Sequence, residues 1–212
     1  MHIDIIFDAI CPWCYIGKRR LEQAIGLRAG IEVTMAWRPF LLNPEMPPEG
    51  IDRRTYLNRK FGNQTRVHRI FGSLANAGQS VEIDFDFDRI GRTPNTVNCH
   101  RLVRFAALSD KADAVVEALF LDYFVNGRDI GETAVLVKIA AGLGLDVEAL
   151  RTYLASERDI PRIYEENSRV HRFGINGVPS FLFNGEMIIS GAQEAPVLAR
   201  MIDAARQLEA AG

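Results

Sequence analysis

The sequence predicts an α/β fold in which the two strand-containing ends of the chain are separated by a large all-helical insertion. Near the start, the short apolar segment His2 to Phe7 precedes a helical pattern and an alternating segment, Ile31 to Trp37. Near the end, Asn184-Gly185 joins two strand-like segments, and this dipeptide favours a tight hairpin. This βαβ … ββα order assigns residues 1–45 and 174–212 to one domain and residues 46–173 to the insertion.

The insertion is expected to contain six or seven helices and no strand between Asp52 and Gly174. Asp52 suits the start of the first helix, because its carboxylate can accept a hydrogen bond from a free backbone N–H. Thr93-Pro94 indicates another helix start, with a hydroxyl cap followed by proline in the first position. Further helical patterns cover residues 65–77, 112–125, 133–141, 147–154 and 160–173, and a last helix covers 194–208.

The composition is that of an ordinary globular protein. Hydrophobic residues make up 48% and charged residues 25% of the 212 residues, so the chain can bury a core without disulfides. Lysine and arginine number 25 and aspartate and glutamate 27, and this near balance argues against nucleic-acid binding. No apolar stretch approaches the roughly 18 residues of a membrane span. The first residues lack a basic segment and include Asp4 and Asp8, so we expect no signal peptide and a cytoplasmic location.

Two of the three cysteines stand together in Cys11-Pro12-Trp13-Cys14. Pro12 suits the first turn of a helix, which predicts Cys11 as an exposed residue at the helix N-terminus, where free N–H groups stabilise a thiolate. Cys14 lies over the same turn and can close a small disulfide ring, so one cysteine would attack and the other resolve. A zinc site usually needs four ligands, and only Cys99 and scattered histidines could complete one, so we expect no metal.

Pro179 stands directly before a predicted strand, in Gly174-Ile175-Asn176-Gly177-Val178-Pro179-Ser180. Proline fits the first position of a strand or a tight turn, and an X-Pro bond can be cis at modest cost. By itself this residue would indicate an ordinary turn. Because it accompanies a cysteine pair at a βα junction and a following ββα unit, we expect it to have a role at the site.

Four segments of the sequence form a recognisable set of motifs: the run from Cys11 to Leu21, Trp37 to Pro44, Gly177 to Phe181 and Ile189 to Gln193. They resemble, in the same order, motifs of the DsbA family of thioredoxin-fold oxidoreductases, and most closely those of its FrnE-like branch. The resemblance implies a thioredoxin-like fold split by a helical insertion, with Val178-Pro179 as a cis-proline loop facing the cysteines. It also implies that Cys11 is the nucleophile and Cys14 the resolving thiol.

The function expected from these residues is thiol–disulfide exchange with protein thiols or with glutathione. Pro12, Trp13, Val178 and Pro179 are expected to contact the substrate, with the Val178 backbone pairing with the substrate chain. No cofactor is expected beyond the redox-active disulfide, although glutathione is a possible co-substrate. Periplasmic members of the family usually have histidine in place of Trp13, and tryptophan cannot carry a charge, which argues against an oxidant of DsbA strength.

Two other functions stay open. Glutathione-dependent enzymes of the same superfamily, the 2-hydroxychromene-2-carboxylate isomerases and kappa-class transferases, share the insertion but typically lack the second cysteine, so Cys14 favours dithiol chemistry. A binding or chaperone module with an apolar groove in the insertion is the third possibility. The direction of exchange, the substrate, the recycling partner and the oligomeric state are not determined by the sequence.

The remaining candidates are weaker. Asp4 and Asp8 flank the first strand, and Asp8 is either a buried carboxylate that takes the Cys14 proton or a surface strand end. Cys99 and His100 are neighbours on a helix and point about 100° apart, so we expect a buried cysteine and a histidine bonded to the backbone. His2, His68 and His171 are isolated and are interpreted as structural or surface residues. A run of basic residues is expected to form a solvated helix face; a less favoured alternative is that it guides an anionic substrate such as glutathione towards the site. The run consists of Arg53, Arg54, Arg59, Lys60, Arg66, His68 and Arg69.

Overall fold

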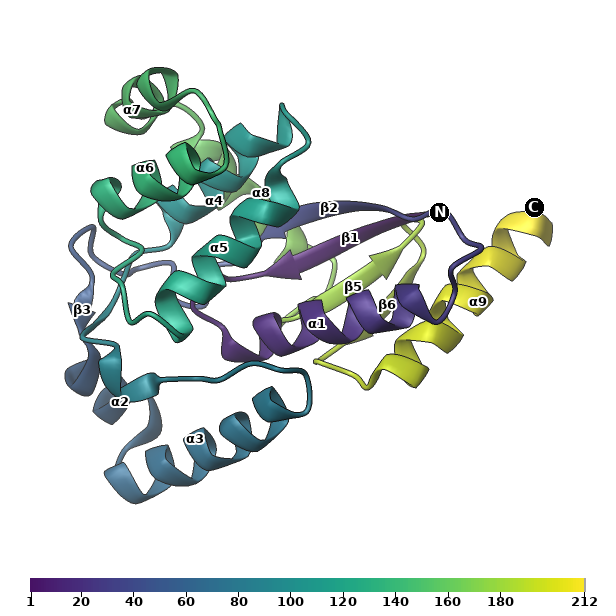
Figure 1. Cartoon of the computed structure of the whole chain (residues 1–212), viewed down its shortest axis with the longest axis horizontal. Coiled ribbons are helices and arrows are strands. Elements are labelled where there is room, and N and C mark those ends of the chain that lie inside the picture. The colour runs from purple at the N-terminus through teal and green to yellow at the C-terminus, as the bar shows by residue number, and fades with distance from the viewer. Residues whose placement is uncertain (212) are drawn as a thin grey trace.

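The computed structural model describes residues 1–211. A four-stranded sheet lies at its centre (Figure 1). The strand order is β2-β1-β5-β6, with β1 (His2–Phe7), β2 (Thr34–Pro39), β5 (Ser180–Phe183) and β6 (Met187–Ser190). β1 is parallel to β2 and antiparallel to β5, and β5 and β6 form an antiparallel hairpin. Strands from the two ends of the chain therefore lie side by side, which confirms the predicted fold class.

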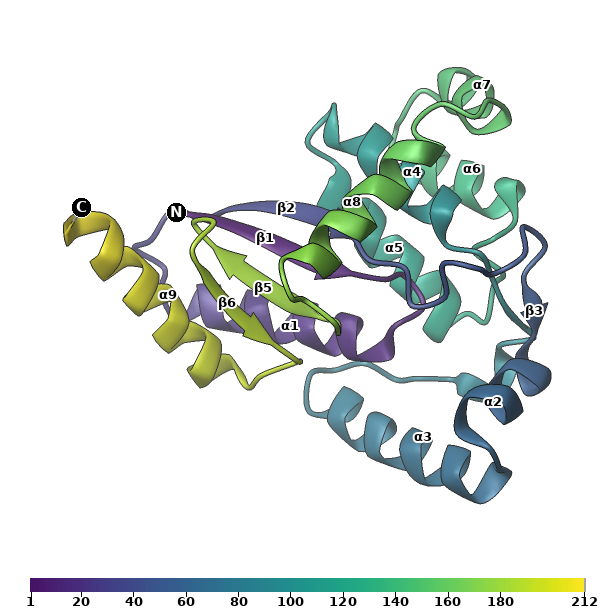
Figure 2. The ribbon, with the colours of Figure 1, turned by 180° about the vertical axis from the view of Figure 1, so that it is seen from behind.

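Helices cover both faces of this sheet. α1 (Pro12–Gly26) packs against α9 (Ala195–Ala211) on one face, and Figure 2 shows α8 (Ile160–Arg172) on the other. The alternation of β1 accounts for the two layers, because Ile3, Ile5 and Phe7 join the main core with α1 and α9. Ile6 points to the other face and packs in a smaller cluster with Phe40 and Ile175.

Within the described residues, seven α-helices lie between β2 and β5, in agreement with the predicted six or seven. Their ends differ from the predicted ones by a few residues, and the Asp52 side chain accepts the Thr55 N–H as the expected cap. Residues 1–211 contain no helix that is both long and apolar enough to cross a bilayer. Besides α8, the helices are α2 (Arg53–Phe61), α3 (Gln64–Gln79), α4 (Val97–Ala107), α5 (Ala112–Phe124), α6 (Thr133–Gly142) and α7 (Val147–Ala155).

Two predictions in the insertion are wrong. β4 (Arg92–Thr93) pairs with β3 (Ile51–Asp52), although no strand was expected there. Two-residue strands are too short to show any hydrophobic period, which is why the sequence gives no sign of them. Thr93-Pro94 does not start a helix, because Thr93 belongs to this ladder and α4 begins only at Val97.

Outside the insertion, the strand that was expected from Ile31 to Trp37 begins instead at Thr34 and extends to Pro39.

Arg101 of α4 fixes the end of α7 from inside the protein. Its guanidinium is buried and donates to the carbonyls of Tyr153, Leu154, Ser156 and Arg158. The last carbonyls of a helix have no partner within the helix, so a buried donor here replaces water. This contact holds α7 against α4, the helix that also brings His100 towards the sheet.

Candidate functional site

The Cys11-Pro12-Trp13-Cys14 segment lies where β1 passes into α1. The Cys11 N–H donates to the Asp8 carbonyl at 3.0 Å, and the Cys14 N–H donates to the Cys11 carbonyl at 2.9 Å. Cys11 is the N-cap residue of α1, with an extended backbone, and Pro12 is the first helical residue as predicted. Cys11 therefore sits at the N-terminal end of α1, where the helix dipole stabilises an anion.

Cys11 is covered rather than exposed, which corrects the expectation from the sequence. Only 5% of the residue is accessible, and its Sγ–H donates to the Val178 carbonyl at 3.6 Å. The segment before β5 supplies this cover, and the sequence could not show how closely it approaches. Trp13, by contrast, is 39% exposed at the surface next to Cys11.

Cys14 is more deeply buried than Cys11, with 1% of the residue accessible. Burial raises the pKa of its thiol well above the usual value, and hydrogen bonding with Cys11 raises it further. All three cysteines are free thiols in this structure. Cys14 is accordingly held in its protonated form at neutral pH and needs a base before it can attack a disulfide.

The segment containing Pro179 reaches Cys11 because of the strand register. Ile6, near the end of β1, pairs with Ser180 at the start of β5, so the residues that flank these strand ends lie together. The Val178–Pro179 peptide bond is cis. The structure thus places Val178 and Pro179 beside Cys11, together with Pro12 and Trp13.

Gly17 has a position at the site that sequence reasoning missed. A Cβ atom on Gly17 would lie 2.7 Å from Cγ of Pro179 and 3.3 Å from Cζ of Phe181. Such a short separation would displace the proline ring, so only glycine allows this approach of α1 to the loop. The available signal was its place in the family-like run from Cys11 to Leu21.

Asp8 is a buried carboxylate, which contradicts its interpretation as a surface strand end. It is fully buried, and its Oδ2 accepts the Leu42 N–H at 2.7 Å while Oδ1 accepts the Ile10 N–H at 3.4 Å. Burial raises the pKa of Asp8 to about 6. Asp4 has a different place, because its carboxylate is bonded to Arg38 Nε at 2.6 Å.

His100 reaches the same carboxylate from the helical insertion. Its Nε2 lies 4.0 Å from Oδ1 of Asp8, and its ring packs edge-on against Phe7. Burial lowers the pKa of His100 to about 3, opposed by a hydrogen bond with the Phe40 backbone. The expected backbone partner is thus present, and the proximity to Asp8 was not predicted. Cys99 is buried and donates to the Ile130 carbonyl at 3.2 Å, so the two neighbours do not form a nucleophile–base pair.

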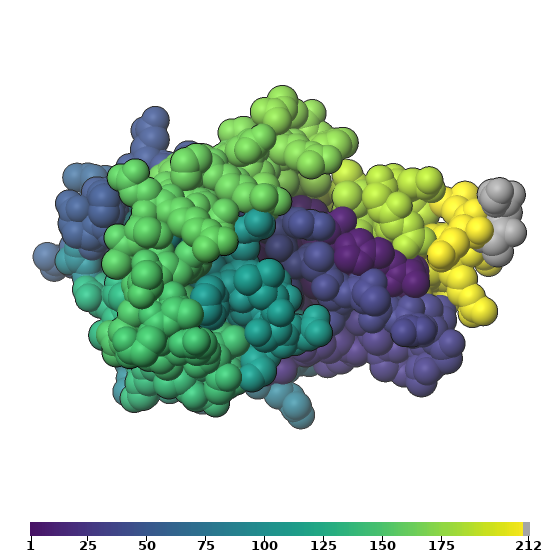
Figure 3. Space-filling view, turned by 90° about the horizontal axis from the view of Figure 1, so that it is seen from above, coloured from purple at the N-terminus to yellow at the C-terminus, as the bar shows by residue number. Residues whose placement is uncertain are grey.

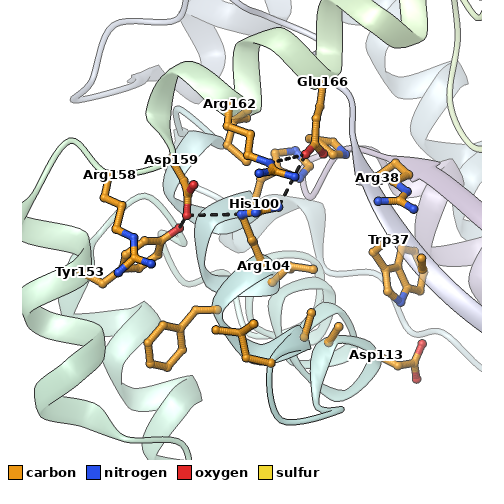
Figure 4. A pocket seen from close by; sticks show the side chains of 18 of the residues that line it. Trp37, Arg38, His100, Arg104, Asp113, Tyr153, Arg158, Asp159, Arg162 and Glu166 are labelled. Atoms are coloured by element: carbon orange, nitrogen blue, oxygen red, sulfur yellow. Dashed lines mark hydrogen bonds and ion pairs between the residues drawn. The ribbon is translucent and has the colours of Figure 1, made fainter.

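A cavity of about 1170 Å³ opens next to His100, between the free edge of β2 on one side and α4, α7 and α8 on the other. Figure 3 shows the hollow between the dark blue residues of β2 and the teal and green residues of the insertion. Figure 4 shows its charged wall, where Arg104 and Tyr153 contact Asp159 and Arg162 contacts Glu166. His100 lines the cavity, whereas neither Cys11 nor Cys14 does.

The other candidates lie apart from the cysteines. The basic residues of α2 and α3 are mostly exposed, which fits a solvated helix face, and Arg53 is half-buried with bonds to Thr93 and Tyr123. His2 contacts Thr34 and Asp4, and His171 packs against Phe40. Among the residues that the structure describes, no three His, Cys, Asp or Glu side chains are grouped so as to hold a metal ion.

Comparison with known proteins identifies two relatives of similar length. A probable DsbA oxidoreductase from Streptomyces coelicolor, SCO1869, has a crystal structure that superposes with a TM-score of 0.88 at 28% identity, covering 98% of this chain and 90% of that one. The uncharacterised protein YwbO of Bacillus subtilis is 26% identical over 209 residues, which is 95% of this chain and 96% of YwbO.

A second solved structure is similar in fold. The cytosolic disulfide reductase DsbM from Pseudomonas aeruginosa superposes with a TM-score of 0.71 at 18% identity, covering 98% of this chain and all of DsbM. The model of the DSBA-like thioredoxin domain matches residues 2–203, which include Cys11, Cys14, Asp8 and the loop of Pro179. The chain therefore belongs to the DsbA-like thioredoxin family of thiol–disulfide oxidoreductases.

Proposed function

We propose that this protein exchanges disulfides with thiol-containing partners through Cys11 and Cys14, with Cys11 as the attacking sulfur. The observation that supports this most strongly is the difference between the two thiols. Cys11 lies at the N-terminus of α1, where helix amides stabilise a thiolate, whereas Cys14 is buried and strongly favours its protonated form. This difference suits a pair in which one sulfur meets the substrate and the other acts afterwards.

In the reducing direction, the Cys11 thiolate attacks one sulfur of a substrate disulfide. The substrate S–S bond breaks, a Cys11–substrate disulfide forms, and the first substrate thiolate leaves and takes a proton from solvent. Cys14 then gives its proton to Asp8 and attacks Sγ of Cys11. The second substrate thiolate leaves, and the Cys11–Cys14 disulfide holds the two oxidising equivalents until another dithiol or two monothiols reduce it. In the oxidising direction the same steps run backwards.

Asp8 suits the role of proton acceptor because its pKa of about 6 is between those of an ordinary carboxyl group and a thiol. It is buried with Cys14, and the charge of the Asp8 carboxylate is one of the influences that raise the pKa of Cys14. A carboxylate in contact with solvent would have a lower pKa and would be a weaker base.

The substrate is expected to lie across Pro12, Trp13, Val178 and Pro179. The Val178 carbonyl, which now accepts the Cys11 Sγ–H, would become available to the backbone of an extended substrate when Cys11 is a thiolate or a disulfide. The exposed Trp13 ring offers an apolar contact next to the sulfur.

Partners are proposed to be protein thiols or glutathione in the cytoplasm, with no cofactor beyond the cysteine pair. The structure of the cytosolic disulfide reductase DsbM has been solved with glutathione, and this makes oxidised glutathione a suitable first substrate to test. A glutathione-dependent isomerase or transferase is the alternative, in which Cys11 only contacts the glutathione sulfur and Cys14 takes no part.

The test is to trap the mixed disulfide in Cys14→Ser. After incubation with oxidised glutathione, mass spectrometry of the variant should show one glutathione on Cys11, because the resolving thiol is gone. Cys11→Ser is the matched control and should form no adduct at the motif. Absence of the Cys11 adduct from Cys14→Ser would contradict the dithiol mechanism.

The same variant separates the two functions. Insulin reduction should be lost in Cys14→Ser if Cys14 resolves mixed disulfides. If instead the wild type isomerises hydroxychromene carboxylates with glutathione and Cys14→Ser does so equally well, the isomerase alternative is correct.

A further inference from the structure

His100 has one buried nitrogen that neither the fold nor the proposed exchange reaction uses so far. Its Nε2 atom is buried and has no hydrogen-bond partner. The Phe40 backbone raises the pKa of the ring, and Nε2 is the nitrogen without a partner, so we assign the proton of the neutral ring to Nδ1. Nε2 consequently carries a lone pair, and it is 4.0 Å from Oδ1 of Asp8.

Three other groups beside the Asp8 carboxylate stabilise its ionised form. Leu42 and Ile10 present N–H donors, and Thr96, the N-cap residue of α4, adds a hydroxyl. Backbone N–H groups cannot accept a proton from Oδ1, so among these groups only the hydroxyl oxygen of Thr96 could do so besides Nε2 of His100. Further groups with an electrostatic effect are Cys14 of α1, Cys99 of α4 and Lys60 of α2.

We propose that His100 is a positioning residue for the exchange reaction, whose neutral Nε2 accepts a hydrogen bond from Asp8 while Asp8 holds the Cys14 proton. This inference rests on the proposed function. The S–H bond of Cys14 breaks and the O–H bond of Asp8 forms, and the O–H is then directed at Nε2. A direct bond requires the two atoms to approach by about 1 Å, or one bridging water.

His100 itself keeps its protonation state throughout. Burial opposes a charge on the ring, which therefore acts as an acceptor and not as a proton carrier. The ring also borders the cavity beside β2 (Figure 4), so it lies between that cavity and the buried carboxylate. A helix of the insertion thereby supports chemistry in the strand-containing part of the molecule.

The test separates the two nitrogens of the ring by substitution. In His100→Asn the amide is placed near Nδ1 and can still donate to Phe40, but nothing occupies the place of Nε2. In His100→Gln the amide reaches the place of Nε2 and can accept from Asp8. Cys99→Ala, on the same helix and equally buried, is the control for a general packing effect.

The measurement is rapid mixing with oxidised glutathione, followed by acid quenching and mass spectrometry of the Cys11–glutathione adduct. In His100→Asn the adduct should form at the wild-type rate and resolve about tenfold more slowly, the effect of one hydrogen bond. Its pH–rate midpoint should move to lower pH, because protonated Asp8 is less stabilised. His100→Gln should recover most of the rate, and Cys99→Ala should match the wild type.

Equal resolution rates in His100→Asn and the wild type would overturn the inference, and so would an unshifted pH profile. If His100→Asn does not fold, His100→Phe, which keeps the ring volume, is the second variant that lacks the acceptor, with the same expected result. If neither the wild type nor Cys14→Ser forms an adduct with glutathione, the proposed function fails. If the adduct forms and resolves at the same rate in the wild type and the His100 variants, the proposed function stands and only the role of His100 is rejected.

Discussion

Gly17 and Pro179 are in direct contact across the site, with so little space between them that the smallest side chain would not fit. The Cβ atom of an alanine at Gly17 would meet Cγ of Pro179 at 2.7 Å. Helix α1 thus sets the position of the loop that covers Cys11. The loop in turn leaves no room for a side chain at Gly17, about one turn after Cys14 on α1. The contact joins two segments from opposite ends of the chain.

Gly17→Ala should therefore destabilise the protein and slow its thiol exchange. Displacing the proline ring is an overpacking cost of about 1–3 kcal/mol, and it also moves Val178 away from Cys11. Gly26→Ala is the matched control, because it is on the same helix and has nothing within 4 Å of the new atom. Thermal melting and glutathione exchange of the two variants check the prediction; equal stability and equal rates in both would contradict it.

Cys11 should react with iodoacetamide at neutral pH well before the other two cysteines. Cys14 and Cys99 are almost completely buried, and burial raises the pKa of both thiols well above the usual value. The thiolate is the reacting form, so both should be slow. Peptide mapping after short labelling of the reduced protein measures the order, and simultaneous labelling of Cys11 and Cys14 would refute it.

Asp8 should make the folded state less stable as the pH rises. Its pKa is raised from 3.8 to about 6, so its contribution to stability is fully present below pH 3.8 and is lost as the pH rises through about 6. The loss is on the order of 3 kcal/mol, from about 1.4 kcal/mol per pKa unit. Asp8→Asn cannot ionise, so its stability should improve relative to the wild type by about this amount between pH 4 and pH 7.5.

Urea denaturation of the reduced proteins at the two pH values measures this difference. Other titrating groups are common to both proteins and cancel in the comparison. If the difference in unfolding free energy between Asp8→Asn and the wild type is the same at pH 4 and pH 7.5, Asp8 is not the titrating group described here.

Local patterns in the sequence were sufficient for most of the fold. The strand at His2–Phe7, the helix that starts at Pro12 and the hairpin at Asn184-Gly185 depend on neighbouring residues, and the structure has all three. Asn184 and Gly185 both adopt the left-handed backbone that such a turn requires. The short ladder of β3 and β4 escaped prediction because its partners are distant in sequence and too short to show a period.

The parts of the site that could not be predicted are the contacts between distant segments. The cover over Cys11 comes from Val178, and its consequence for exposure depends on a distance that no pattern encodes. The approach of His100 to Asp8 depends on how α4 packs against β1, which only the folded chain determines. For Asp8, the sequence left a buried carboxylate and a surface strand end open, and the burial that excludes the second depends on the packing of the folded chain.

The most direct test of the account is a redox titration of the Cys11–Cys14 pair in Cys99→Ala, which removes the third thiol. The protein is equilibrated in buffers of reduced and oxidised glutathione, quenched with acid, alkylated and mapped by mass spectrometry. We expect one two-electron transition in which Cys11 and Cys14 lose their free thiols together and form a disulfide with each other. If Cys11 only accumulates bound glutathione while Cys14 stays a free thiol at every ratio, the two residues are not a redox pair and the central claim is wrong.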